Sequence, residues 1–219
     1  MTHRVTLEAS LNELQMLILK MGKSVEVAIH DSIMSLKVGD VELAELIVAN
    51  DRNLNQVEDQ IMELGAKAIA TQQPVARDMR IILTSFRIAS DLERMGDLAV
   101  DIAKVTIRIG DQALIKPLVD IPRMAELAIN MVKEGMEAYI HQNVDLAYKM
   151  AKIDDEVDAL YSQNIRELFV FMIENPKTIN QGMLLSFVGR YLERIADHAT
   201  NIGESVVYLV TGKRPDLNS

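Results

Sequence analysis

A six-residue motif that occurs twice, one hundred residues apart, constrains the fold of this chain more than any other feature. Residues 92–97 read LERMGD and residues 192–197 read LERIAD. Four positions are identical, and the other two exchange small or apolar residues. The repeat indicates a duplicated unit whose shared feature is a set of acidic side chains at the same helical phase.

The amino-acid composition predicts an all-helical protein. Hydrophobic residues make up 49% of the 219 residues, but aromatic residues only 4%, and there are 13 methionines. Leu, Ile, Ala, Met, Glu and Lys favour helices, while the aromatic-rich segments typical of strands are missing.

Turn and helix-breaking residues divide the chain into six helical segments of two similar halves. A second match supports the duplication: VELA at 41–44 aligns with VDLA at 144–147, an offset of 103. Gly110, Pro117 and Pro122 mark the linker between the halves. The predicted helices cover residues 7–37, 41–70, 76–109, 123–140, 144–173 and 177–210.

Helices of about thirty residues are about 45 Å long, and short loops force neighbouring helices to run antiparallel. We therefore predict an all-α fold of two tandem antiparallel three-helix bundles related by internal duplication. The first bundle is expected over residues 1–112 and the second over 119–212, followed by a C-terminal tail at 213–219.

Charge and targeting signals narrow the functional classes. The net charge of −9 argues against nucleic-acid binding, which needs a basic surface. The chain has no cysteine, so it has neither disulfides nor thiolate metal ligands. The N-terminus lacks the apolar core of a signal peptide, and the longest apolar run, 168–173, is too short to span a membrane. We expect a cytoplasmic protein that reaches a membrane only through partners.

The repeated motif places carboxylates four residues apart. Glu93, Asp97 and Asp101 drift by only about 80° around a helix, so they form one acidic strip beside the apolar stripe. The second copy carries Glu193, Asp197 and Asn201. Antiparallel packing would bring matching polar residues of the preceding helix against each strip: Asp51, Asn55 and Glu58 in the first copy, Asp154 and Asp158 in the second.

Two interpretations of these strips stay open on spacing alone. One is a solvated helix face balanced by neighbouring arginines. The other is a site for a hard cation, because carboxylates suit Mg, Mn, Fe or Zn and no thiolate competes. Asn201 replaces the Asp101 of the first copy, and an amide oxygen is the weaker ligand. For His198, which follows Asp197, we expect a surface or capping role.

Two other functional classes remain as alternatives. A metal-dependent helical-bundle enzyme would need ligands converging inside a bundle, and the E-x-x-H motif of di-iron bundles is missing. A purely structural interaction bundle would use its acids only as a soluble face. The sequence also has no G-x-x-x-x-G-K loop for binding phosphates.

The paired L-E-R-x-x-D motifs, each on the third helix of a three-helix unit, resemble the PhoU family over essentially the whole chain. Two flanking phrases strengthen the resemblance, RDMR at 77–80 and GRY at 189–191. It implies a non-catalytic regulator of phosphate uptake that represses the phosphate-starvation response. Such a protein links the ATPase of the phosphate ABC transporter to a sensor histidine kinase, and family members are commonly homodimers.

The resemblance also implies metal ions, of iron, zinc, magnesium or manganese, on the acidic faces. Carried over position by position, it makes the candidate ligands Asp51, Glu58, Glu93, Asp97, Asp101, Asp154, Asp158, Glu193, Asp197 and Asn201. No catalytic residue is expected.

Overall fold

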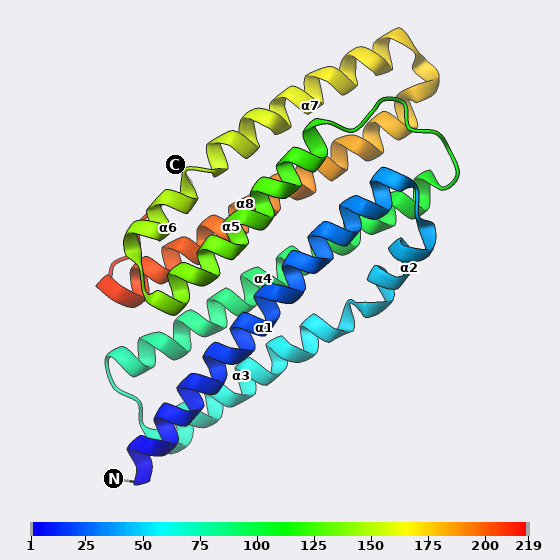
Figure 1. The fold of residues 1–219 in the computed structure, drawn as a ribbon. Coiled ribbons are helices and arrows are strands. Elements are labelled where there is room, and N and C mark those ends of the chain that lie inside the picture. Colours follow the sequence, from blue (N-terminus) through cyan, green and yellow to red (C-terminus); the bar gives the residue numbers. More distant parts are fainter. Residues whose placement is uncertain (1, 218–219) are drawn as a thin grey trace.

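A computed structural model describes residues 2–217, with side chains from residue 5 onward, and this part of the chain contains helices and no strand. The predicted all-α class is confirmed (Figure 1). The elements are α1 (Thr2–Val38), α2 (Val41–Asn50), α3 (Arg52–Gln72), α4 (Arg77–Ile109), α5 (Asp120–His141), α6 (Val144–Ala151), α7 (Asp154–Glu174), the 3-10 helix η1 (Pro176–Thr178) and α8 (Ile179–Thr211).

Each half is a three-helix bundle whose middle helix is bent into two pieces. The sequence predicts single helices over 41–70 and 144–173, but the structure divides them into α2 and α3 and into α6 and α7. The bend falls at Asp51 in the first half and at Lys152 and Ile153 in the second. All three residues keep right-handed helical dihedral angles, so the bends leave no strong sequence signal.

Matching caps begin the middle helix in both halves. The Asp40 carboxylate accepts a hydrogen bond from the Leu43 N–H at 2.9 Å, and the Asn143 side chain accepts one from the Leu146 N–H at 3.0 Å. Each bond satisfies an N–H group that the first helical turn would leave unpaired. Gly39 supplies the positive φ, 73°, that turns the chain out of α1.

The first helix of the second bundle begins earlier than the predicted residue 123. Pro122, expected to break the helix, lies in the first turn of α5, which starts at Asp120. A first-turn proline costs little because its missing N–H would have no partner there. The linker is therefore residues 110–119. Gln181 of α8 holds it by accepting from the Ile115 N–H at 2.6 Å and donating to the Ala113 carbonyl at 3.1 Å.

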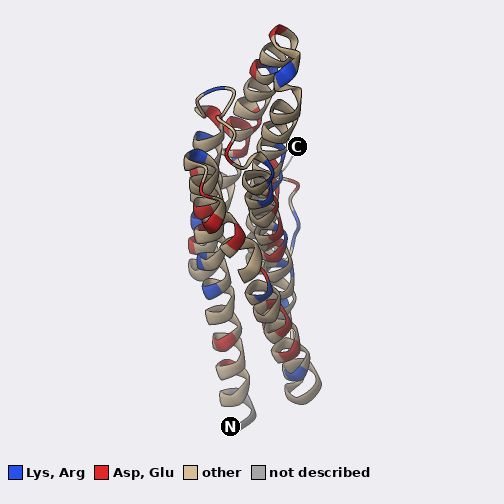
Figure 2. Ribbon diagram, turned by 90° about the vertical axis from the view of Figure 1, so that its right-hand side faces the viewer, with Lys and Arg blue, Asp and Glu red and all other residues tan. Residues whose placement is uncertain are grey.

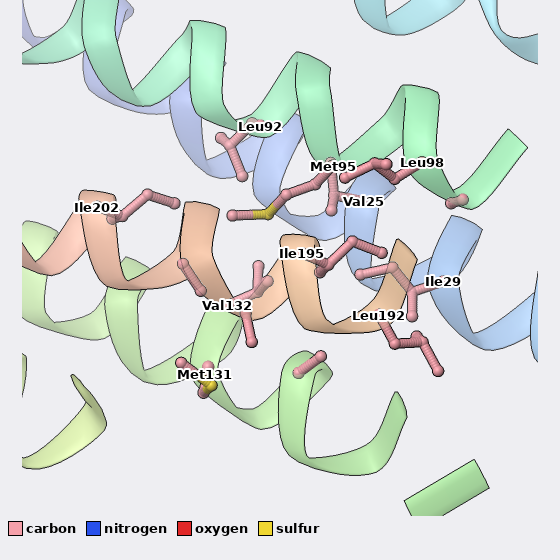
Figure 3. Close-up of a cluster of buried hydrophobic side chains, with 14 of the residues drawn as sticks. Val25, Ile29, Leu92, Met95, Leu98, Met131, Val132, Leu192, Ile195 and Ile202 are labelled. Atoms are coloured by element: carbon pink, nitrogen blue, oxygen red, sulfur yellow. The ribbon is translucent and has the colours of Figure 1, made fainter. Parts of the chain in front are cut away.

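The two bundles lie side by side and share one core (Figures 1 and 3). α4 and α8 pack antiparallel at the centre: Arg80, near the start of α4, lies beside Gly212, just after the end of α8. α1 packs on α4, α5 packs on α8, and α1 and α5 also contact each other, while α2 and α3 lie outside on one side and α6 and α7 on the other. The shared core buries residues that include Val25, Ile29, Leu92, Met95, Leu98, Met131, Val132, Leu192, Ile195 and Ile202.

Lys and Arg residues and Asp and Glu residues are interspersed along the helices (Figure 2). Within residues 2–217, no helix combines the length and the apolar character that crossing a membrane requires. The predicted C-terminal tail is non-helical from Lys213 to Leu217, and the Leu217 N–H donates to Glu204 of α8 at 2.9 Å. Residues 218 and 219 of that tail lie outside the described residues.

Two acidic faces, one on each bundle

The helix bends place one acid of each half beside the repeated motif. Asp51 lies between α2 and α3, and Asp154 is the first residue of α7. These two positions correspond in the duplication. Each interacts with acids of the motif-bearing helix of its own half, α4 for Asp51 and α8 for Asp154.

The first acidic face consists of Asp51 and Glu58 with Glu93, Asp97 and Asp101 of α4. Burial raises the pKa of Asp51, and the charges of Asp97 and Asp101 raise it further. Burial likewise raises the pKa values of Glu58 and Glu93, with additional contributions from Asp97 in both cases. Mutual repulsion of this kind requires the carboxylates to lie close together. The structure therefore brings together the five acids predicted for the first half.

Two basic side chains partly balance the first face. Arg94 lies 3.5 Å from Glu93 and 3.3 Å from Asp97, and Lys104 donates to Asp101 at 2.8 Å. Both basic side chains are more than half exposed, so solvent weakens these ion pairs. The cluster keeps an excess of negative charge.

The second acidic face consists of Asp154 and Asp158 of α7 with Glu193 and Asp197 of α8. Burial raises the pKa of Asp154 to about 7, helped by the charges of Asp158, Asp197 and Glu193. Burial and Asp197 also raise the pKa of Glu193, although Arg190 pairs with it at 2.5 Å. Burial is also the main cause of the raised pKa of Asp197, and the charge of Asp158 raises it further.

Two oxygens of the second face are buried without a hydrogen-bond donor: Oδ1 of Asp154 and Oε2 of Glu193. A buried carboxylate oxygen without a partner is costly, and either a proton or a cation would relieve it. An all-oxygen donor set suits a hard divalent cation. Among residues 2–217, however, no three His, Cys, Asp or Glu side chains are already arranged as metal ligands. A cation would have to draw the carboxylates of either face closer together.

Asn201 turns away from the acids with which the sequence groups it. Its side-chain nitrogen donates to Asp91 of α4 at 3.2 Å, across the contact between the bundles. His198 contacts the same Asp91 oxygen through Nδ1 at 2.9 Å, and only a fifth of its side chain is exposed. His198, for which a surface or capping role is expected from the sequence, instead lies partly buried against the neighbouring bundle.

Asp91 is a polar residue of this region that sequence reasoning missed. Tyr191 occupies the corresponding position of the second half, so the duplication gives no hint of it. Its spacing from His198 in sequence, 107 residues, also hides the contact. Only the side-by-side packing of α4 and α8 brings the two together.

These features define a duplicated helical-bundle protein that presents one acidic face on each half. The chain belongs to the PhoU family: the PhoU domain matches residues 18–106 and again residues 121–206. The resemblance inferred from the repeated motifs is thereby confirmed.

Relatives match over nearly the full length of the chain. A phosphate-specific transport system accessory protein PhoU homolog of Clostridium acetobutylicum is 40% identical over 219 residues and covers 100% of both chains. The homolog of the same name from Aquifex aeolicus is 40% identical over 203 residues, 93% of this chain and 92% of its own. Because family members are named as accessory proteins, the expectation that the chain is not an enzyme is confirmed.

Solved structures share the fold. The crystal structure of PhoU from Pseudomonas aeruginosa is 34% identical, with a TM-score of 0.90 over 94% of this chain and 99% of that one. The phosphate transport system regulatory protein PhoU from Streptococcus pneumoniae is 29% identical, with a TM-score of 0.89 over 96% and 99%. The duplicated bundle arrangement described above is thus common to the family.

Proposed function

We propose that this chain is a cytoplasmic accessory protein of a phosphate-specific transport system, which represses the phosphate-starvation response when phosphate is plentiful. In this role it links the transporter ATPase to a phosphate-sensing histidine kinase and acts as a homodimer. Full-length similarity to proteins named as accessory components of phosphate transport carries the proposal.

The helical architecture suits an adaptor. Outer helices such as α3 and α7 each present about 30 Å of side-chain surface to a partner, since both have 21 residues. Neither acidic face is a direct phosphate site, because clustered carboxylates repel an anion. Phosphate status would reach the protein through the conformations of its partners.

The acidic faces are proposed as the metal sites of this adaptor. Asp51, Glu58, Glu93, Asp97 and Asp101 would hold a cation on the first face. Asp154, Asp158, Glu193 and Asp197 would do so on the second, with Asn201 joining only if it leaves Asp91. A bound divalent cation of iron, zinc, magnesium or manganese supplies positive charge that offsets the repulsion among carboxylates. The orphaned oxygens of Asp154 and Glu193 support the second site most directly.

The adaptor proposal is tested by binding. The purified protein is titrated by calorimetry with the transporter ATPase and with the cytoplasmic part of the kinase, with and without inorganic phosphate. We expect binding to at least one of them. No interaction with either protein under both conditions would overturn the proposal.

A second experiment, with a charge-matched pair of variants, tests whether the two acidic faces bind metal. One variant carries Glu93→Gln, Asp97→Asn, Glu193→Gln and Asp197→Asn. The control removes four exposed acids outside the faces through Glu42→Gln, Glu45→Gln, Glu63→Gln and Glu137→Gln. We expect only the first to lose bound metal, by elemental analysis, and to derepress a phosphate-starvation reporter. If both retain repression, the acids form only a solvated face.

A further inference from the structure

A large hollow lies on the first bundle, between its helices. Its volume is about 530 Å³, within the range of ligand-binding clefts. It opens between α1 and the α2–α3 bend, and α4 closes its base. Leu54, Val57 and Val100 supply an apolar floor, and the half-exposed Val27 adds further apolar surface. We call this hollow the α1–α3 groove.

Four carboxamide side chains line the α1–α3 groove: Asn50, Asn53, Gln56 and Gln60. The last three are spaced by three and four residues, so they project from one side of α3. All four are exposed, and within residues 2–217 none makes a side-chain hydrogen bond. Each carboxamide offers both donors and an acceptor, which is the same complement that a peptide unit of a backbone offers.

The dimensions of the groove suit an elongated ligand. From Asn53 to Gln60 the α3 side of the groove extends about 10 Å, and from Lys20 to Asp31 the α1 side extends about 16 Å, at 1.5 Å per helical residue. An extended polypeptide rises about 3.3 Å per residue, so three to five residues fill this length. Its alternate side chains point to one face, where the apolar floor receives them.

The charge of the lining excludes a free anion such as phosphate. Lys20 is the one basic residue among the described lining residues, and it shares the groove with Asp31 and Asp51. His30 contacts the Asp31 carboxylate at 2.9 Å, and the first acidic face surrounds Asp51. The groove therefore favours a ligand that is neutral or carries one basic side chain.

The second bundle lacks this row of carboxamides. The positions that correspond to Asn50, Asn53 and Gln56 hold Ile153, Glu156 and Ala159. Gln163, which corresponds to Gln60, donates instead to Asp120 at 3.3 Å. The carboxamide row is thus not a requirement of the duplicated fold.

We propose that the α1–α3 groove binds an extended polypeptide segment of a partner protein. The carboxamides pair with its backbone, and alternate apolar side chains occupy the floor. The tail of this chain does not fill the groove from within, because residues 213–217 run along α8, where Leu217 is bonded to Glu204. The proposal concerns a binding site of the purified protein and does not depend on the transporter or the kinase. Asp51 belongs both to this groove and to the first acidic face, so the binding experiments are done without metal.

The probe is a random heptapeptide library displayed on phage, selected against the full chain in chelator. The tightest binders are then synthesised and measured by calorimetry against wild type and against the Gln56→Ala/Gln60→Ala variant. We expect apolar residues at alternate positions in the selected peptides. The variant should weaken binding about tenfold or more, as the loss of two hydrogen bonds predicts.

Two controls separate backbone pairing from apolar contact and from misfolding. Asn130→Ala removes an exposed carboxamide of α5 outside the groove and should leave affinity unchanged. N-methylation of alternate peptide residues removes backbone donors but keeps every side chain, and it should abolish binding. Peptides that are insensitive to N-methylation or to the Gln56 and Gln60 substitutions, or a selection with no binder tighter than about 1 mM, overturn the proposal.

Discussion

Leu54 of α3 occupies space that only a glycine at position 96 of α4 leaves open. A Cβ atom on residue 96 would lie 2.4 Å from Leu54 Cδ1. In the second half the corresponding positions hold Ala196 and Val157, both fully buried. In the first copy a leucine thus packs against a glycine. In the second copy a valine packs against an alanine, and these two residues are closer in size.

Replacing Gly96 with alanine should lower the free energy of unfolding by about 1–2 kcal/mol, because Leu54 must move within a packed interior. Leu54→Val in that background shortens the opposing side chain and reproduces the pair of the second half. We expect the double variant to recover part of the loss, although Leu54→Val alone costs about 1 kcal/mol. Urea unfolding of all four proteins gives the coupling energy, and simple additivity would contradict this account.

The same exchange of sizes recurs further along these helices. Phe86 of α4 lies against Gly65 of α3, where an added Cβ would approach a ring carbon to 2.3 Å. The corresponding positions of the second half are Ser186 and Leu168. The larger side chain of the pair lies on α4 in the first half and on α7 in the second, while the combined size of the two side chains stays similar. Such paired changes preserve the packing of a duplicated core even where the two sequences differ.

The sequence predicted the class of fold because the duplicated motif fixes which helices correspond and the turn residues fix where they end. It did not predict the side-by-side packing of the bundles. α4 buries Leu98 and Val105 in addition to the stripe of Leu92, Met95 and Ile102. This wider apolar face is the sequence feature that could have indicated packing against a second bundle. The sequence also does not show that Asn201 lies apart from the second acidic face, because its partner Asp91 is brought to it only by tertiary packing.

The raised pKa of Asp154 predicts a stability that depends on pH. Its folded value of about 7 exceeds the model-peptide value of 3.8. The folded state therefore favours the protonated carboxyl. The contribution of this group to the free energy of unfolding is fully present below about pH 4 and is lost as the pH rises through 7. Asp154→Asn removes the charge and should raise the free energy of unfolding by about 2 kcal/mol at pH 8 in chelator.

The measurement is urea unfolding of wild type and Asp154→Asn between pH 4 and 8. The stability difference between them should grow with pH across this interval. Asp145→Asn, an exposed acid in the first turn of α6, serves as the control and should show no such growth. A pH-independent difference for Asp154→Asn would contradict a buried, repelled carboxyl.

A divalent cation should stabilise the protein if the acidic faces bind it. At a free concentration one hundred times the dissociation constant, the gain is about 2.7 kcal/mol per site. Thermal unfolding with increasing Mn²⁺ or Mg²⁺ should raise the Tm of wild type. Glu193→Gln/Asp197→Asn should lose the contribution of the second face, and Glu93→Gln/Asp97→Asn that of the first. A Tm that rises equally in wild type and in both variants would place the cation elsewhere.

Gln181 should determine how firmly the linker is held against the second bundle. Its buried side chain joins the Ala113 carbonyl and the Ile115 N–H, so Gln181→Ala removes two hydrogen bonds and should cost about 2 kcal/mol. Hydrogen exchange at the Ile115 amide should accelerate in this variant. Gln181→Glu keeps an acceptor for that amide but no donor for Ala113, so it should retain more protection. Gln112→Ala, an exposed linker position, is the control. Unchanged exchange at Ile115 in Gln181→Ala would mean that the neighbouring Lys116–Glu167 ion pair holds the linker by itself.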